Sequence, residues 1–180
     1  MVYRGTQEGS LNLSFTKYEP VRFRSPEYIA VWSEQVAATS YNISKDAREA
    51  MKDMAVSGYP NEICGLLLGR IDADGWHVSE VRQVANVNIE RASDRFQLDP
   101  AGYQAVDRDI RGSDVEIIGV FHSHPDCPAK PSPTDLDGAW EGFLYPIVSV
   151  CEGEVLDIRC WEPRDDTQQF HPVLLAESVQ

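Results

Sequence analysis

The alternation of hydrophobic and polar residues predicts a helix followed by a buried strand in the first half of the chain. Ser44 is a suitable N-cap, and the apolar residues after it recur at helical spacing until Gly58 and Pro60 end the run. Residues 63–69 then form a short, continuous apolar run bounded by glycine, which is typical of a strand buried on both faces. Glu62 stands at the entrance to this strand.

The remaining pattern predicts strands and helices in mixed order. The expected elements are a strand over 76–84, a candidate strand within 87–98, a helix that begins at Asp99-Pro100, a strand over 116–122, a helix that begins at Ser132-Pro133 and carries Leu136 and Trp140, and a hairpin of strands over 144–151 and 155–161. This order predicts the α+β class, with a mixed, largely antiparallel sheet flanked by helices in a three-layer α/β/α arrangement.

The pattern also divides the chain into three parts. Residues 1–41 are polar and mixed, and we interpret them as an N-terminal extension that adds a strand or wraps the domain. A disordered tail is the alternative, but it would leave apolar residues such as Phe23 and Trp32 exposed. Residues 42–162 are expected to form the domain, and residues 163–180 a C-terminal tail.

Charge narrows the range of partners. The chain of 180 residues has 29 acidic and 16 basic residues and a formal net charge of −13. Such a balance argues against nucleic acid or an anionic membrane surface as the natural partner, and a basic protein or peptide suits it better. Acidity that serves only solubility is an equally open interpretation.

Neither a membrane span nor a disulfide framework is expected. No run approaches the roughly 18 apolar residues that a span requires, and no positive segment precedes an apolar one at the start of the chain. The four cysteines form no C-x-x-C pair, so we expect reduced thiols. The protein is therefore expected to be soluble and cytoplasmic.

A cluster of residues that can bind a metal ion begins at the end of the expected strand 116–122. Alternate residues of a strand project to one face, so His122 and His124 can both reach one metal ion. Asp135, at the third position of the next predicted helix, lies within reach of the same ion, and the proline-rich loop before it restricts its freedom. Two imidazoles and one carboxylate leave a fourth position open, as in catalytic zinc sites. Such an ion lowers the pKa of its water toward roughly 7.

Hydrolysis also requires a carboxylate to accept the proton of that water. Glu62 is the candidate, because it opens a buried strand that can lie beside the histidine strand. Ser132 caps the helix that carries Asp135, and its hydroxyl lies at the positive end of that helix.

These residues resemble the JAMM signature of MPN-domain metallopeptidases, in the short prokaryotic form. The resemblance extends over about residues 41–161. It rests on Glu62 before an apolar glycine-bounded strand, on His122-Ser123-His124-Pro125, and on Ser132 and Asp135, which follow His124 with seven and ten residues in between. The segments Arg95-Phe96, Asp99-Pro100 and 147–150 also fit.

The resemblance implies a fold of the MPN and cytidine deaminase type, with one catalytic zinc ion. His122, His124 and Asp135 would bind zinc, Glu62 would act as general base and acid, and the Ser132 hydroxyl would stabilise the oxyanion. The implied activity is that of a zinc isopeptidase or peptidase acting at the C-terminal tail of a ubiquitin-like or sulfur-carrier protein. The tail would lie extended beside the sheet.

Several alternatives stay open. The chain could be a noncatalytic MPN scaffold, although it retains every ligand. A zinc deaminase would need an H-x-E and a P-C-x-x-C signature, which this chain lacks. Cys127 could take the fourth ligand position and silence the site, or be an ordinary loop residue. His77 and His171 lie outside the motif. The ubiquitin-like substrate, the reaction it undergoes and the oligomeric state are not determined.

Overall fold

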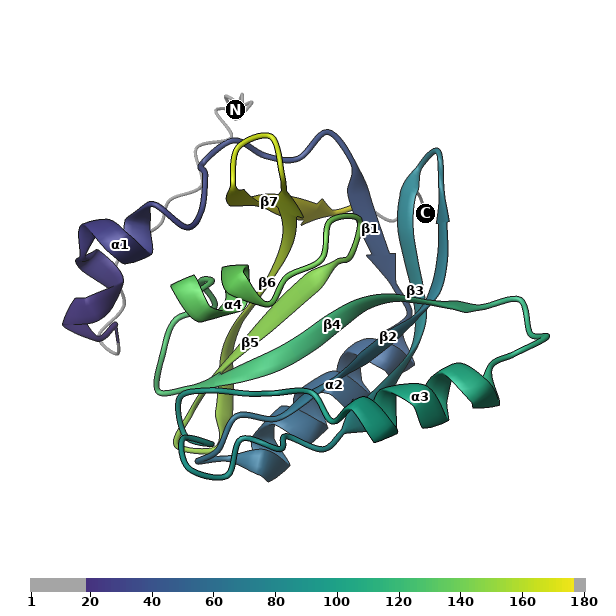
Figure 1. The fold of residues 1–180 in the computed structure, drawn as a ribbon, viewed down its shortest axis with the longest axis horizontal. Coiled ribbons are helices and arrows are strands. Elements are labelled where there is room, and N and C mark those ends of the chain that lie inside the picture. Colours follow the sequence, from purple (N-terminus) through teal and green to yellow (C-terminus); the bar gives the residue numbers. More distant parts are fainter. Residues whose placement is uncertain (1–18, 177–180) are drawn as a thin grey trace, which may run out of the picture.

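The strands of the protein form one mixed sheet, seen in the computed structural model, which describes residues 19–176 (Figure 1). The strands are β1 (Ser40–Ile43), β2 (Cys64–Asp72), β3 (Gly75–Val84), β4 (Glu116–Pro125), β5 (Tyr145–Cys151), β6 (Glu154–Arg164) and β7 (Gln169–Leu175). Their order, β1-β3-β2-β4-β5-β6-β7, closes into a barrel because β1 also pairs with β7. The α+β class and the mixed sheet are thus confirmed, and the longest pairings, β2 with β3 and β5 with β6, are antiparallel.

The helices over 45–58, 100–109 and 133–137 begin where the sequence indicates, whereas two short helices within residues 21–29 are not among the predicted elements. The helices are the 3-10 helix η1 (Val21–Arg24), α1 (Pro26–Ile29), α2 (Lys45–Gly58), α3 (Pro100–Asp109) and α4 (Pro133–Asp137). The Ser44 hydroxyl accepts a hydrogen bond from the Ala47 amide at the start of α2, and the Asp99 carboxylate accepts two from the first turn of α3. These caps satisfy amide groups that have no partner within the helix.

Two hydrophobic clusters lie on opposite faces of the sheet, because successive side chains of a strand alternate between faces. In β2, Leu67 belongs to the cluster that contains Met51 of α2. Its neighbours Leu66 and Leu68 belong to the other cluster, which contains Val106 of α3. The central strands are therefore buried on both faces, as the continuous apolar run at 63–69 predicts. Full burial of each such leucine contributes roughly 1.5–3 kcal/mol.

Three features differ from the sequence-based expectations. No strand forms within 87–98: only an isolated bridge joins Asn86 to Leu98. The helix that begins after Ser132 ends at Asp137, so that Trp140 lies beyond it. Residues 169–175, placed in the expected tail, form β7 and pair with β6.

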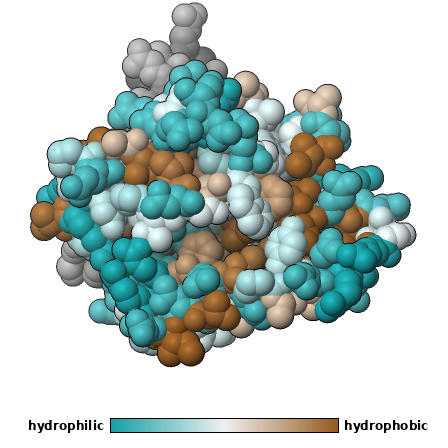
Figure 2. All heavy atoms as spheres, viewed as in Figure 1, coloured by the Kyte–Doolittle hydropathy of each residue, from teal (hydrophilic) through white to brown (hydrophobic). Residues whose placement is uncertain are grey.

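The other boundaries stay predictions. The division at residues 41 and 162 is not decided by the fold, and residues 1–18 and 177–180 lie outside the described residues. Within residues 19–176, no helix is both long and apolar enough to cross a membrane. Figure 2 shows the face seen in Figure 1, on which hydrophobic residues are exposed in several small groups, in the middle and at the margins, among more hydrophilic ones.

Candidate active site

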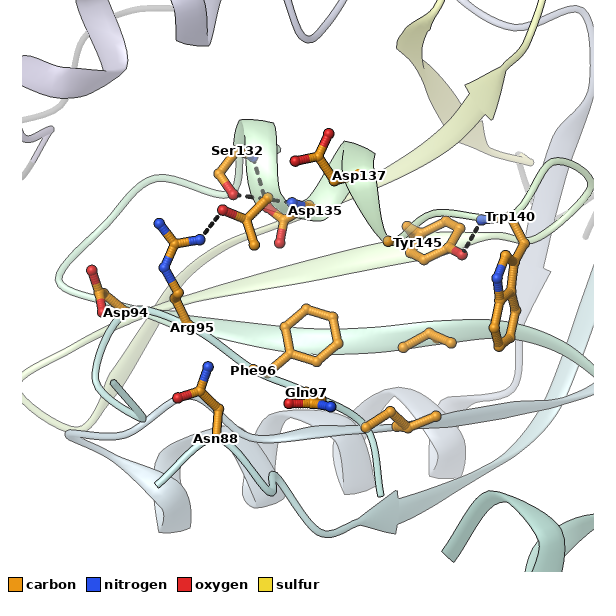
Figure 3. Close-up of a pocket in the computed structure, with 14 residues that line it drawn as sticks. Asn88, Asp94, Arg95, Phe96, Gln97, Ser132, Asp135, Asp137, Trp140 and Tyr145 are labelled. Carbon is orange, nitrogen blue, oxygen red and sulfur yellow. Dashed lines mark hydrogen bonds between the residues drawn. The ribbon is translucent and has the colours of Figure 1, made fainter. Parts of the chain in front are cut away.

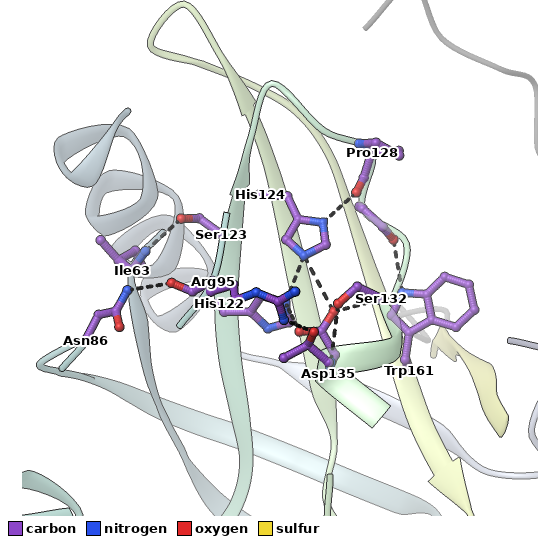
Figure 4. A network of polar contacts seen from close by, with 12 residues as sticks. Ile63, Asn86, Arg95, His122, Ser123, His124, Pro128, Ser132, Asp135 and Trp161 are labelled. Atoms are coloured by element: carbon purple, nitrogen blue, oxygen red, sulfur yellow. Dashed lines mark hydrogen bonds and ion pairs between the residues drawn. The ribbon is translucent and has the colours of Figure 1, made fainter. Parts of the chain in front are cut away.

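The three predicted metal ligands meet at the end of β4. Nε2 of His122 lies 3.0 Å from Nε2 of His124, and the Asp135 carboxylate oxygens lie 3.5 Å from the first nitrogen and 3.7 Å from the second (Figure 4). A tetrahedral zinc ion bound at 2.0–2.1 Å separates its ligand atoms by roughly 3.3 Å. The observed spacing and the donor set, two imidazoles and a carboxylate, therefore fit such an ion.

Hydrogen bonding and stacking orient the two imidazoles. Nδ1 of His124 donates to the carbonyl of Pro128 at 2.8 Å, which leaves Nε2 as the ligand atom. The His122 ring stacks on Phe96, with ring centroids 4.4 Å apart and planes inclined by 27°. Both imidazoles are buried. Ligand orientation is thus fixed before any ion binds.

The loop between β4 and α4 is anchored to the neighbouring strands. The Ser149 hydroxyl of β5 donates to the carbonyl of Cys127 at 2.6 Å, and the Trp161 indole of β6 donates to the carbonyl of Ala129 at 3.0 Å. At the end of the loop, the Ser132 hydroxyl accepts from the Asp135 amide, and the Asp135 carboxylate accepts from the Ser132 amide at 2.6 Å. This capping box fixes the third ligand.

Ser123, between the two histidines, ties β4 to the strand that follows Glu62. Its hydroxyl accepts a hydrogen bond from the Ile63 amide, and its own amide donates to the Ile63 carbonyl, both at 3.0 Å. The alternation of the strand directs this side chain away from the histidines, but it does not reveal the contact with Ile63. Because Ile63 adjoins Glu62, Ser123 sets the position of that carboxylate relative to the metal ligands.

Asn86 is a second brace that the sequence analysis did not identify. Its side-chain amide donates to the carbonyls of Glu62 and Arg95, both at 3.0 Å, and its carbonyl oxygen accepts from the Gln97 amide. One side chain therefore joins the backbone beside the candidate base to the segment that carries Phe96. An asparagine after a predicted strand gives no signal of this role.

Glu62 lines a small cavity together with the candidate ligand His124. The cavity measures about 10 Å³, and its lining includes Glu62, His124 and Ser132. This is room for about one water molecule. Glu62 is 7% exposed, and burial raises the pKa of its carboxyl to about 8, although the nearby charge of His124 lowers it.

The charges of the ligands respond to burial and to one another. Burial lowers the pKa of His122 below its usual range, which favours the neutral imidazole. Burial also disfavours protonation of His124, but its hydrogen bond to Asp135 and the charge of Glu62 outweigh it, and the pKa is raised. Burial disfavours ionised Asp135, yet the two imidazoles hold its pKa well below the usual range. The carboxylate is therefore ionised and ready to bind a cation.

A larger groove leads to the same residues from the other side (Figure 3). It has a volume of about 460 Å³, and Ser132 and Asp135 lie at one end. Its lining continues over the apolar side chains of Phe96, Leu98 and Val120, and ends at Trp140 and Tyr145. The Tyr145 hydroxyl accepts from the Trp140 amide at 2.8 Å, which fixes this far end.

The structure brings all five predicted site residues together, namely Glu62, His122, His124, Ser132 and Asp135. Cys127 lines the small cavity as well. His77 and His171 lie elsewhere: His77 pairs with Asp72 in the β2–β3 hairpin, and His171 contacts Thr167 and the carbonyl of Gln35.

Known proteins resemble this chain over the same region. Residues 44–164 match the family described as prokaryotic homologs of the JAB domain. The desampylase of Haloferax volcanii is 31% identical over 119 residues, which cover 63% of this chain and 84% of that protein. The CysO-cysteine peptidase of Mycobacterium tuberculosis is 29% identical over 136 residues, which cover 75% of this chain and 90% of that protein.

Two solved structures have the same fold. A protein of Desulfitobacterium hafniense superposes with a TM-score of 0.65 at 28% identity, over 78% of this chain and 95% of that one. A protein of Salinibacter ruber superposes with a TM-score of 0.59 at 32% identity, over 77% of this chain and 93% of that one.

Proposed function

This chain belongs to the prokaryotic JAB-domain family of JAMM-type hydrolases, and we propose that it is a zinc-dependent peptidase. Its substrate would be the amide bond that follows the C-terminal tail of a ubiquitin-like or sulfur-carrier protein. The observation that carries the proposal is the position of Glu62, a buried carboxylate that lines a cavity for about one water molecule together with His124, one member of the His-His-Asp cluster. The names of the relatives, desampylase and CysO-cysteine peptidase, support the substrate class.

His122, His124 and Asp135 would hold the zinc ion through the atoms that converge in Figure 4. When bound, zinc polarises the scissile carbonyl and makes an attacking water more acidic.

Glu62 would transfer the proton in both halves of the reaction. It accepts a proton from the attacking water as the new carbon–oxygen bond forms, and it returns that proton to the nitrogen as the carbon–nitrogen bond breaks. Burial raises the pKa of this carboxyl to about 8 in the metal-free protein, and the charge of a bound zinc ion would lower it toward neutral pH, where a carboxylate can accept and return a proton. The braces from Ser123 and Asn86 hold it in place for this task.

Ser132 would stabilise the oxyanion. It lines both the small cavity and the larger groove, so its hydroxyl lies where the tail and the attacking water meet. In the free protein this hydroxyl accepts from the Asp135 amide, and its own hydrogen stays available for donation. Loss of one such donor costs on the order of 10²–10³ in kcat.

The larger groove is the proposed site of the tail. Its volume of about 460 Å³ gives room for several residues of a peptide, and its apolar wall at Phe96 and Leu98 suits backbone and small side chains near the cleaved bond. The exposed Trp140 at the far end would contact a larger side chain further along the tail.

The test is cleavage by the full chain loaded with zinc. The enzyme is incubated with a panel of ubiquitin-like and sulfur-carrier proteins, each with one residue or a lysine conjugate after its tail. The products are identified by mass spectrometry. We expect cleavage that a chelator abolishes, that Glu62→Gln removes with zinc binding retained, and that Asp135→Asn removes together with zinc binding. Asp53→Asn, an exposed change on α2, is the matched control. Zinc-loaded wild type that cleaves no substrate would refute the proposal and favour a noncatalytic scaffold.

A further inference from the structure

An N-terminal segment packs against the candidate active site and lines its small cavity. We name residues 19–32, which contain η1 and α1, the N-terminal cap (Figure 1). A hydrogen bond from the amide of Phe170 to the carbonyl of Val31, at 2.8 Å, attaches it to β7. At its other end, Glu19 forms a buried ion pair with Lys130 in the loop before α4, at 2.7 Å. The cap therefore spans from the edge of the sheet to the metal-ligand loop.

Residues of the cap complete the small cavity at the reaction centre. Arg22, Phe23 and Tyr28 line it together with Glu62 and His124. Phe23 is buried, and its ring centroid lies 6.2 Å from that of His124. The catalytic centre is thus partly built from a segment about one hundred residues away in sequence.

The cap lines the cavity beside the one that suits the tail, so we place the leaving group on the side of the cap. The groove that suits the tail contains Asp135, and the small cavity contains Glu62 and His124, while Ser132 lines both. A substrate whose tail fills the groove therefore has its scissile carbonyl near Ser132. The amine on the other side of that bond points toward the cap.

Arg22 is the only Lys or Arg among the described residues that line this cavity. Its side chain is 42% exposed, so it lies at the boundary between this cavity and solvent. One of its terminal nitrogens donates to the Cys127 sulfur at 3.4 Å, and the other lies 3.6 Å from the Asp94 carboxylate. Asp94 already accepts hydrogen bonds from Arg91.

These contacts leave Arg22 able to bind a better acceptor. A guanidinium presents five N–H groups in a planar fork, and its preferred partner is a carboxylate held by two parallel hydrogen bonds. A thiol sulfur is a weak acceptor, and the Asp94 carboxylate is shared with Arg91.

We propose that Arg22 binds the carboxylate of the leaving group, so that the enzyme favours a tail joined to the α-amine of a free amino acid. The inference rests on the proposed function and adds its substrate class. An amino acid released from its α-amine carries a carboxylate two bonds from the departing nitrogen, within the span of a side chain at this wall. A lysine joined through its side chain within a protein has no carboxylate near the cleaved bond.

Three matched substrates test the proposal with the full chain loaded with zinc. Each contains one tail peptide ending in Gly-Gly, joined to alanine with a free carboxylate, to alaninamide, or to the side-chain amine of acetyl-lysinamide. We expect kcat/KM for the free carboxylate to exceed that for the amide by about tenfold or more. In Arg22→Gln the first value should fall to that of the amide, and Arg22→Lys should retain part of the preference.

Arg70→Gln is the matched control, because Arg70 is an exposed arginine of β2 that does not line the cavity. It should keep the full preference, and thermal unfolding should show that both variants are folded. Equal cleavage of acid and amide by the wild type would overturn the inference and leave the proposed function standing. The inference would also be overturned if Arg22→Gln kept the preference for the free carboxylate, or if the wild type cleaved the lysine conjugate faster than the free carboxylate. Cleavage of none of the three by zinc-loaded enzyme would count against both.

Discussion

In the metal-free protein, Glu62→Gln should become more stable relative to the wild type as the pH rises. The carboxyl is 7% exposed, and burial raises its pKa from 4.5 to about 8. Between these values the folded state keeps the proton while the unfolded state has released it. The unfolded state therefore binds fewer protons, and the free energy of unfolding falls as the pH rises through this window. The slope for one proton is about 1.4 kcal/mol per pH unit, which amounts to at most about 3 kcal/mol between pH 5 and pH 7.

Glutamine has nearly the same shape and never ionises, so Glu62→Gln escapes this loss. The assay is urea unfolding of chelator-treated wild type and variant at pH 5, 6 and 7, followed by circular dichroism. We expect the free energy of unfolding of the variant, relative to that of the wild type, to increase with each pH unit, although the variant lacks activity. Glu90→Gln, at an exposed carboxylate, should follow the wild type. A difference between Glu62→Gln and wild type that does not change with pH would refute the argument from burial.

Further predictions concern the residues that hold the ligands. Phe96→Ala should weaken zinc binding by about tenfold, because His122 loses its stacking partner, as competition with a chelating dye would show; Phe96→Leu should lose less. Ser123→Ala should lower the free energy of unfolding by about 1–3 kcal/mol, since the buried Ile63 amide loses its acceptor, and a denaturation curve that matches wild type would contradict this. Zinc affinity, measured by calorimetry, should fall as the pH drops below 7. Protons then compete with zinc for His124, because the pKa of this residue is raised. Equal affinity at pH 7.5 and pH 5.5 would exclude this competition.

Much of the fold is predictable because its elements carry strong local signals. The caps at Ser44 and Asp99 locate α2 and α3, and the apolar run at 63–69 locates β2. The segment 87–98 misleads because its apolar residues suggest a strand. Its backbone is instead held by the side chain of Asn86, which bonds to residues on both sides of the loop. A side chain that replaces a strand ladder leaves no periodic pattern.

The closure of the sheet is also beyond what the sequence predicts. β1 pairs in parallel with both β3 and β7, and each partner is distant in sequence. β1 is short, and its side chains are mostly half-buried. Such a strand is defined by its neighbours rather than by its own composition.

The candidate site shows the same division between local and distant information. His122, His124, Ser132 and Asp135 lie on one strand and the helix after it, so their spacing alone predicts a common ion. Glu62 could be added because a buried strand follows it. The contacts of Ser123 with Ile63, by contrast, depend on the pairing of β2 with β4. That register is decided by packing across the whole sheet.

The position of the N-terminal cap depends on contacts between residues distant in sequence, among them a buried pair of charges. Glu19 and Lys130 are almost completely buried, and burying one such charge without the other costs several kcal/mol. The pair therefore keeps η1 beside the loop that ends in Asp135, and Lys130 also lies over the ring of Trp32, at the far end of the cap. A change that disorders this loop should displace both Asp135, a candidate metal ligand, and the wall that carries Arg22. The N-terminal cap is thus coupled to the order of the loop before α4.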